Sequence, residues 1–102
     1  MDTFLQTVSA LSDATRVQIL AFIQEHRELC VCDIEKSFNM IQSRISRHLK
    51  ILKDAGFLSV ERRGRWAYYS ISPALEGFQA ATLKEIASLD IELPKLQKGC
   101  SL

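Results

Sequence analysis

The 102-residue sequence has no long run of apolar residues. A membrane-spanning helix needs about 20 predominantly apolar residues, and the opening stretch MDTFLQTVSA lacks the basic and then apolar pattern of a secretory signal. We therefore expect a protein that stays in the cytoplasm and has no membrane partner. The length suits a single domain, and a composition of 47% hydrophobic and 25% charged residues is that of an ordinary globular protein.

Cysteine is scarce, with three residues at Cys30, Cys32 and Cys100. An odd number of thiols in the reducing cytoplasm indicates metal ligands, redox sensors or buried core residues rather than disulfides. Cys30 and Cys32 stand one residue apart in the stretch RELCVCDIE. A thiol oxidoreductase would be expected to carry Cys-x-x-Cys beside a βαβ unit. Neither feature is present, so we do not predict an enzyme.

The net charge is only +1, but the positive residues are unevenly placed. Seven Lys and Arg between residues 44 and 65 stand against Asp54 and Glu61, which gives this part +5 and leaves −4 for the rest. Positive charge that extends over a helix and a following hairpin indicates a surface that binds the phosphates of nucleic acid. A solvated charged face is the plainer alternative.

The hydrophobic pattern of the first third of the chain predicts three helices. Apolar residues from Phe4 to Leu11 at helical spacing give an amphipathic first helix. The second helix, which Ser12 or Asp13 can cap, is apolar over so much of its circumference that we expect it to be central and buried. A short third helix is predicted at about residues 33–38.

The next segment, NMIQSRISRHLKILKDAGF, has a clear helical pattern. Its residues Ile45, Leu49 and Leu52 form one inward stripe, and Gly56 supplies a C-terminal stop. The side chains left on the outer face are polar or basic: Ser43, Arg44, Arg47, Lys50 and Lys53.

A β-hairpin is predicted after Gly56, with the tip ERRGRW and with Gly64 permitting the tight turn. Pro73 is expected to open the last helix, which carries apolar residues up to Leu89. Residues 91–102 are expected to form a flexible C-terminal tail. The predicted fold class is therefore mainly α with a small β-hairpin.

A short helix, a turn, a basic helix and a hairpin with a basic tip make up a winged helix-turn-helix. In such a unit the second helix fits the major groove of double-stranded DNA, and the hairpin arginines lie along the neighbouring backbone. Protein contacts are the alternative use of the fold, and at His48 a packing hydrogen bond is the alternative to a phosphate contact. The predicted DNA-binding residues are Gln42, Ser43, Arg44, Ser46, Arg47, His48, Lys50, Arg62, Arg63 and Arg65.

Four stretches in order, SDATRVQIL, ELCVCDI, SRISRHLKILKDAGFL and RRGRWAYYSIS, resemble the ArsR/SmtB family of metal-responsive transcriptional repressors. The resemblance runs from about residue 3 to residue 89. It implies a homodimer built by the N- and C-terminal helices, which sits on an inverted-repeat operator and leaves when a toxic metal ion binds. Residues 1–90 then form the DNA-binding and dimerisation domain, with residues 91–102 as the tail.

The chemistry of Cys30 and Cys32 narrows the choice of inducer. Neither a regular strand nor a regular helix brings the sulfurs of residues i and i+2 onto one small ion, so chelation requires a distorted backbone at the start of the third helix. A site with sulfur ligands and no nearby imidazole suits arsenic(III) or antimony(III) better than nickel, cobalt or zinc. No organic cofactor is expected. The alternatives are a cadmium- or lead-responsive repressor, a thiol-redox-responsive one, and two small buried hydrophobes.

The resemblance leaves the third ligand open. The arsenic pattern commonly has a third cysteine three residues after the second, and here that residue is Glu35. The family's cadmium and zinc sensors add N-terminal cysteines or a last helix with histidine, and this chain has neither. Cys100 is the remaining thiol and a candidate third ligand, because roughly ten residues after Leu89 could reach about 33 Å. An idle thiol in the tail is the equal alternative.

The start of the recognition helix also departs from the family. Members often have a small polar residue there, and this chain has Ile41. Capping and base contacts then fall to Gln42 and Ser43.

Overall fold

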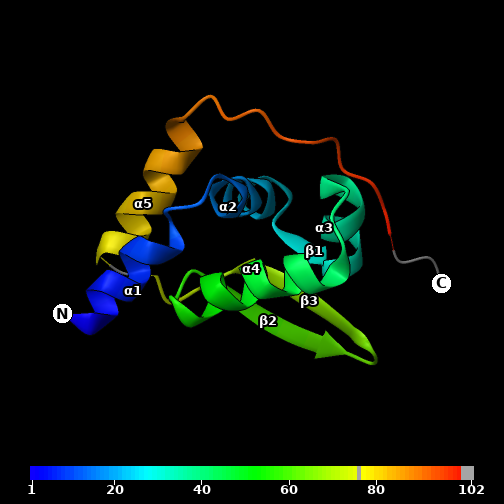
Figure 1. The fold of residues 1–102 in the computed structure, drawn as a ribbon, viewed down its shortest axis with the longest axis horizontal. Helices are drawn as coiled ribbons and strands as arrows, with labels where there is room; N and C mark the ends of the chain where they lie inside the picture. Colours follow the sequence, from blue (N-terminus) through cyan, green and yellow to red (C-terminus); the bar gives the residue numbers. More distant parts are fainter. Residues whose placement is uncertain (76, 100–102) are drawn as a thin grey trace.

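The computed structural model describes residues 1–75 and 77–99 of the chain. Within these residues five helices and a three-stranded antiparallel sheet follow one another, as Figure 1 shows. This arrangement confirms the predicted fold class of a mainly α winged helix-turn-helix. The elements are α1 (Asp2–Ala10), α2 (Ala14–His26), β1 (Glu28–Cys30), α3 (Val31–Phe38), α4 (Gln42–Asp54), β2 (Leu58–Arg63), β3 (Trp66–Ile71) and α5 (Gly77–Ser88).

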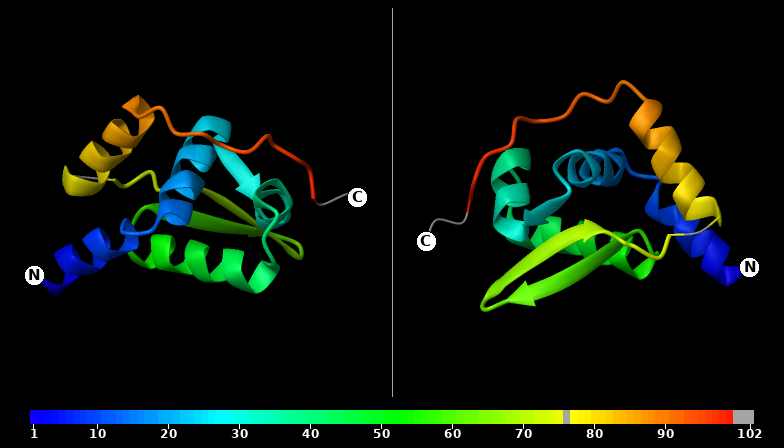
Figure 2. Two further views of the ribbon diagram at one scale, coloured as in Figure 1. Left: turned by 45° about the horizontal axis from the view of Figure 1, so that its top comes forward. Right: turned by 180° about the vertical axis from the view of Figure 1, so that it is seen from behind.

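Helix α2 lies at the centre of the molecule, between α1 and α5 on one side and α3 on the other (Figures 1 and 2). Asp13 is its cap, because the carboxylate accepts a hydrogen bond from the Arg16 backbone N–H at 3.0 Å. Four of its side chains are fully buried, which confirms the central position predicted from the sequence. They are Ile19, Leu20, Phe22 and Ile23.

Helix α4 packs its predicted inward stripe into this core. Ile45, Leu49 and Leu52 are all 0% exposed. Gly56, with φ 91°, follows the helix, and its N–H bonds to the Lys53 carbonyl while that of Phe57 bonds to Leu52. This pair of bonds is the Schellman arrangement that a left-handed glycine permits, so the predicted stop is confirmed.

The sheet contains the predicted hairpin and one strand more. Strand β3 lies in the middle of the order β1-β3-β2 and pairs antiparallel with both neighbours. Arg63 stands opposite Trp66 across a two-residue turn in which Gly64 has φ 64°. Strand β1 pairs Cys30 with Tyr68, and the sequence pattern did not predict it.

Two helix starts differ from the sequence predictions. Helix α3 begins at Val31, two residues before the predicted start, and this places Cys32 in its first turn. Helix α5 runs over Gly77–Ser88, so the prediction that Pro73 opens it is wrong. Pro73 instead lies in a turn where the Ser72 hydroxyl accepts a hydrogen bond from the Ala74 N–H at 3.2 Å.

After α5 the chain continues in extended form across α2 and reaches α3 (Figures 1 and 2). We call residues 91–99 the strap. Its apolar side chains Ile91, Leu93 and Leu96 pack against the core. That residues 91–102 form a flexible tail remains a prediction.

No helix in the described part of the chain is long and apolar enough to cross a membrane.

Candidate cysteine site and nucleic-acid interface

Cys30 and Cys32 lie on either side of a change from strand to helix. Cys30 is the last residue of β1 and the N-cap of α3, with an extended backbone (φ −70°, ψ 146°) and a side chain only 2% exposed. Cys32 belongs to the first turn of α3 and is half-buried. The backbone between the two sulfurs is therefore irregular, which is the condition that chelation by residues i and i+2 requires.

Cys32 is disulfide-bonded in the structure, whereas the composition favoured free thiols. Thiolate chemistry at this residue therefore depends on reduction of that bond. Cys100, the third predicted ligand, lies outside the described residues. Within residues 1–75 and 77–99 there is no group of three or more His, Cys, Asp or Glu side chains that could hold a metal ion.

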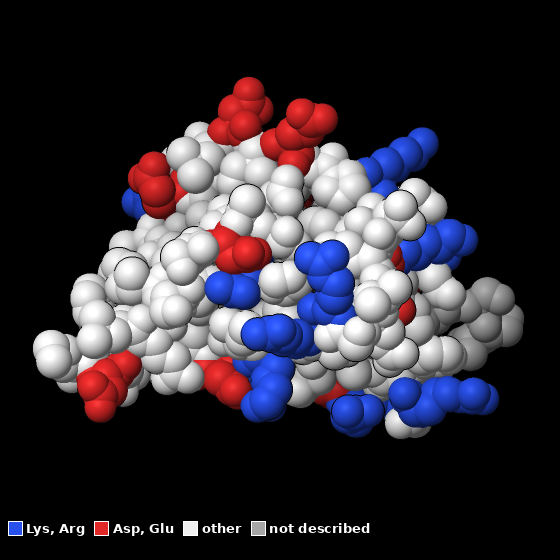
Figure 3. Space-filling view, viewed as in Figure 1, with Lys and Arg blue, Asp and Glu red and all other residues white. Residues whose placement is uncertain are grey.

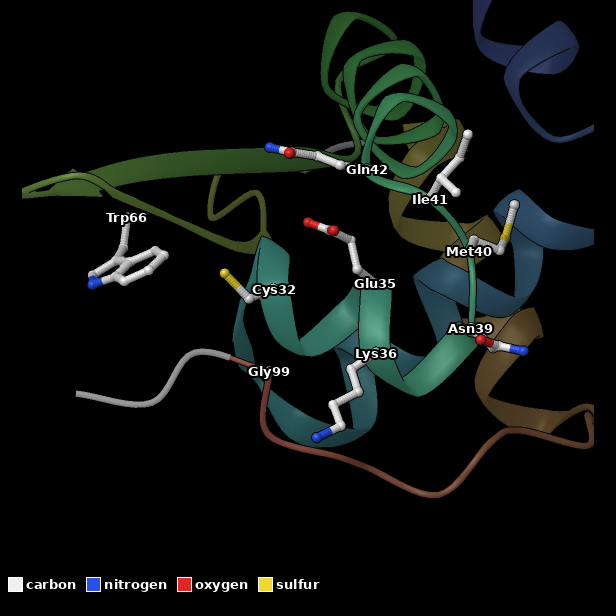
Figure 4. A pocket seen from close by; sticks show the side chains of 9 residues that line it. All are labelled: Cys32, Glu35, Lys36, Asn39, Met40, Ile41, Gln42, Trp66 and Gly99. Atoms are coloured by element: carbon white, nitrogen blue, oxygen red, sulfur yellow. The ribbon is translucent and has the colours of Figure 1, made fainter.

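An open groove of about 540 Å³ adjoins Cys32. In Figure 4 the Cys32 sulfur and the Glu35 carboxylate point into this groove, and Gly99 lies beside the start of α3. Glu35 stands where the resemblance leads one to expect a third cysteine, so an oxygen replaces a sulfur on the same face. The groove is completed by Lys36, Asn39, Met40, Ile41, Gln42 and Trp66.

The outer face of α4 is basic and exposed. Figure 3 shows Lys and Arg side chains gathered over the centre and lower right of the molecule, where α4 and the hairpin lie, with others at the right edge. Asp and Glu side chains lie along the upper edge and also at the lower left and centre. Ile41 is the N-cap and makes no side-chain capping bond. The expectation that capping falls to Gln42 and Ser43 is therefore wrong, because α4 begins at Gln42 and both residues lie inside the helix. Six of the seven predicted DNA-binding residues on this helix are exposed: Gln42, Ser43, Arg44, Ser46, Arg47 and Lys50.

Lys50 is held by a neighbour on its own helix. Its Nζ lies 2.9 Å from the Asp54 carboxylate one turn further on. This hydrogen bond raises the pKa of Lys50 and lowers that of Asp54. Both side chains are exposed, so the pair contributes little to stability.

His48, the seventh predicted DNA-binding residue on α4, is largely buried, with its side chain 14% exposed. Its Nδ1 lies 3.3 Å from Arg16 Nη1 and 4.0 Å from an Asp13 carboxylate oxygen. Burial lowers the pKa of His48; Asp13 opposes this shift, and the positive charges of the nearby arginines add to it. A guanidinium only donates, so neutral His48 accepts the bond at Nδ1.

Arg16 is a functional candidate that the sequence analysis did not single out, although it lies in the SDATR stretch. Its Nε donates to the Ala10 carbonyl at 2.8 Å while its Nη1 faces His48. One side chain thus joins the end of α1, the start of α2 and His48 of α4. It links α4 to the junction of α1 and α2.

The β2–β3 hairpin is the wing of the winged helix-turn-helix, and its three predicted DNA-binding arginines differ in their surroundings. Arg63 donates to both carboxylate oxygens of Glu28, at 2.9 and 2.8 Å, and also to Glu61, and it lies over the Tyr68 ring. These carboxylates raise its pKa above the usual arginine range. Arg62 and Arg65 are exposed and make no ion pair with the described part of the chain.

Comparison with known proteins identifies the family. Residues 13–60 match the family described as "Bacterial regulatory protein, arsR family". The arsenical resistance operon repressor of Escherichia coli (strain K12) is 36% identical over 81 residues, which cover 79% of this chain and 69% of that protein. The chain belongs to the ArsR family.

Other relatives are named for resistance to arsenic or to cadmium. The arsenic resistance transcriptional regulator ArsR1 of Pseudomonas putida is 37% identical over 82 residues, covering 80% of this chain and 64% of that protein. A cadmium resistance regulatory protein CadC homolog of Staphylococcus aureus is 39% identical over 62 residues, covering 61% and 51%. The chain therefore spans less than two thirds of some relatives that it matches.

A solved structure supports the winged helix-turn-helix assignment. The domain Mb0332 of Mycobacterium bovis has a TM-score of 0.72 at 26% identity, covering 83% of this chain and 75% of that one, and is described as homodimeric and DNA-binding. Reduced HlyU of Vibrio cholerae shares the fold, with a TM-score of 0.73 at 21% identity over 89% and 92% of the two chains. This ArsR-family protein is thus a transcriptional regulator of the winged helix-turn-helix type, and not an enzyme.

Proposed function

We propose that this ArsR-family repressor binds an inverted-repeat operator as a homodimer and is released when arsenite or antimonite binds to its cysteine thiolates. The observation that carries the proposal is the position of Cys30 and Cys32 at the start of α3, the first helix of the DNA-binding unit. The names of the E. coli and P. putida relatives support an arsenic-type inducer. An ion bound here acts on the backbone that leads into that unit.

Two exposed apolar helices support a homodimer. Phe4 and Leu5 on α1 are 54% and 53% exposed, and Phe78 on α5 is 42% exposed. The rings of Phe4 and Phe78 lie edge to face with centroids 5.4 Å apart, so the two helices form one surface. A continuous apolar patch on a small domain marks an interaction site, and a second copy provides the two recognition helices that an inverted repeat needs.

The basic surface supports DNA binding in the manner of other winged helices. Helix α4 presents its N-terminal residues to the major groove, and the wing follows the adjacent phosphates. Arg62 and Arg65 have no carboxylate partner among the described residues, and they are the wing residues best suited to phosphates. Arg63 reaches a phosphate only by exchanging its pairs with Glu28 and Glu61.

The junction of β1 and α3, which holds Cys30 and Cys32 and which we call the cysteine junction, connects to both the wing and the recognition helix α4. Strand β1, which ends at Cys30, is hydrogen-bonded to β3 of the wing. Helix α3, which carries Cys32, packs against α4 and is joined to it by the turn that begins at Asn39. A change at the junction therefore reaches the wing and the recognition helix together, and a coupling of about 1 to 3 kcal/mol is enough for release.

The proposed ligands are Cys30, Cys32 and Cys100. Arsenic(III) and antimony(III) suit an all-sulfur site because thiolates select soft ions. The CadC homolog makes a cadmium- or lead-responsive repressor the first alternative. The disulfide bond of Cys32 favours a second alternative, in which oxidation rather than ion binding releases the DNA.

An anaerobic titration of the reduced, operator-bound protein separates these possibilities. Fluorescence anisotropy of a labelled operator is followed while arsenite, antimonite, cadmium, lead or peroxide is added. The proposal expects release by arsenite and antimonite at the lowest concentrations. Release by peroxide alone, or by cadmium well before arsenite, contradicts it.

A further inference from the structure

One large apolar side chain is exposed on the DNA-binding unit. Ile41 is 66% exposed, and it is the only exposed large hydrophobic residue within the described residues 31–71. The other exposed apolar residues of the described chain lie on or beside α1 and α5, where a second copy is proposed to cover them. The exposure of Ile41 therefore needs a different explanation.

Ile41 also occupies the cap position of α4. It is the N-cap, with an extended backbone (φ −69°, ψ 153°), and its side chain makes no capping bond. Its carbonyl accepts the first helical bonds, from the Arg44 N–H at 3.1 Å and the Ile45 N–H at 3.2 Å. A serine, threonine, aspartate or asparagine side chain at an N-cap accepts a further N–H and stabilises the helix. Isoleucine therefore costs the free protein a capping bond and leaves apolar surface in water.

The place of Ile41 is the end of the recognition helix that contacts bases. In helix-turn-helix proteins the N-terminal residues of this helix contact base edges in the major groove. Ile41 is continuous with the exposed polar and basic face of α4, because the exposed Gln42 and Ser43 follow it directly. In Figure 4 the side chains of Ile41 and Gln42 leave the start of α4 in different directions, so they can reach different base pairs.

The major groove offers one apolar group to such a side chain. The base pairs present hydrogen-bond donors and acceptors there, together with the C5-methyl group of thymine. The isoleucine side chain has no donor or acceptor, so it can contact neither a phosphate nor a base edge through a hydrogen bond. A single exposed apolar residue among polar and basic neighbours is also far smaller than a protein–protein interface. The thymine methyl is therefore the partner that fits.

We infer that Ile41 is a specificity-determining residue that packs against the C5-methyl group of a thymine in each half-site of the operator. The inference rests on the proposed function and names one base that the operator must contain. Gln42 suits the same kind of sequence, because a glutamine amide can bond to both N6 and N7 of adenine. The contact removes from water the apolar surface that Ile41 exposes in the free protein. The start of α4 thus favours A·T pairs.

The test uses the full-length protein, reduced and without arsenite. The parent first selects duplexes from a random library, so that the operator sequence is defined by experiment. Ile41→Ser removes the apolar group and supplies a capping side chain, and Ile41→Val is the matched control that keeps a branched apolar one. Serine is the better cap, so urea unfolding should show Ile41→Ser to be at least as stable as the parent. A loss of DNA affinity in this variant is then not a loss of folding.

The selected operator is then remade with deoxyuridine in place of one thymine at a time, which removes only the C5-methyl group. At the contacted thymine of one half-site, the parent and Ile41→Val are expected to lose affinity about fourfold, the effect of one buried methyl-sized group. Ile41→Ser is expected to bind the thymine operator at least about tenfold more weakly than the parent, because it loses the contact in both half-sites. It should show no further loss with deoxyuridine. The slope of log K against log salt should be the same in all three proteins, because a methyl contact releases no counterion.

Three results would overturn the inference while the proposed function stands. The first is a parent that loses no affinity with deoxyuridine at any thymine. The second is an Ile41→Ser protein that keeps the parent's loss with deoxyuridine, and the third is an Ile41→Ser protein with a changed salt slope, which would mean altered contacts with phosphates. A parent that selects no sequence from the library overturns both the inference and the proposed function.

Discussion

Arg63 and Glu28 form a two-pronged ion pair that ties the wing to the strand carrying Cys30. The Nη1 and Nη2 atoms of Arg63 lie 2.9 and 2.8 Å from the two Glu28 carboxylate oxygens. Glu28 stands two residues before Cys30 on β1, and Arg63 ends β2. The pair therefore spans the sheet from the cysteine junction to the wing.

The occupied guanidinium of Arg63 predicts a difference between the wing arginines. Arg62→Ala or Arg65→Ala removes a cation available to a phosphate, and the slope of log K against log salt should flatten by about 0.9 for each lost contact. Arg63→Ala should flatten it clearly less, because its charge is already balanced by carboxylates. Anisotropy titrations at several salt concentrations measure the slopes, and equal slopes in the three variants would count against this assignment.

On α4, Arg47→Ala should weaken operator and non-operator DNA together. The side chain is exposed on the outer face, and phosphate contacts carry no sequence information. The salt slope should again flatten by about 0.9. Lys95→Ala, an exposed change in the strap, is the control and should leave both affinity and slope as they are. An unchanged Arg47→Ala protein would exclude the docking of this helix face on DNA.

Substitutions on the buried and exposed faces of α4 are expected to differ in their effect on the free energy of unfolding. Leu49 is 0% exposed, so Leu49→Ala should lower the free energy of unfolding by about 2 to 5 kcal/mol. Lys53→Ala, on the exposed face of the same helix, should change it by less than about 0.5 kcal/mol. Urea unfolding followed by circular dichroism measures both, and similar losses in the two variants would contradict the helix orientation.

His48 predicts a loss of stability on acidification. Burial lowers its pKa in the folded protein, with Asp13 opposing and Arg16, Arg44 and Arg47 reinforcing the shift. The unfolded chain then binds the proton more readily, so the free energy of unfolding falls as the pH drops from the ordinary histidine pKa of about 6.5 through the lowered value. Urea unfolding across this window should show a smaller pH dependence for His48→Gln than for the parent. The same dependence in both proteins would mean that another group is responsible.

The α1–α5 surface predicts the effect of a charge on assembly. Leu5→Asp places a carboxylate on the exposed apolar face of α1, where a partner would have to desolvate it. Sedimentation should show a dimer for the parent and a monomer for Leu5→Asp. Ile41→Ser, at an apolar residue of the DNA-binding unit that is 66% exposed, is the control and should remain dimeric. A dimeric Leu5→Asp protein would place the interface elsewhere.

Much of the fold was predictable because its signals are local. The spacing of Ile45, Leu49 and Leu52 identifies the buried side of α4, and Gly56 and Gly64 mark two turns that adopt a left-handed backbone. Strand β1 was not predicted, because three residues are too few to show alternation and its partner β3 lies far along the chain. Pro73 favours a helix start in general, but here it belongs to a turn.

The site was predictable only in part, for a related reason. Cys30 and Cys32 are separated by one residue in the sequence, so their chemistry can be inferred before the structure is known. Asp33 and Ser37 look like solvated helix residues, and nothing local indicates that the strap covers them. Arg63 counts as a positive residue in any charge pattern, whereas pairing with Glu28 balances it.

Release of the operator is expected to follow ion binding at Cys30 and Cys32. The most direct test compares the parent with Cys30→Ser and Cys32→Ser, all reduced and anaerobic, by operator anisotropy with and without arsenite. We expect equal DNA binding without arsenite, a loss of affinity of about 5- to 150-fold in the parent when arsenite is added, and no arsenite effect in either variant. If arsenite lowers the operator affinity of both variants by a factor within twofold of that seen for the parent, the proposed role of the cysteines is contradicted.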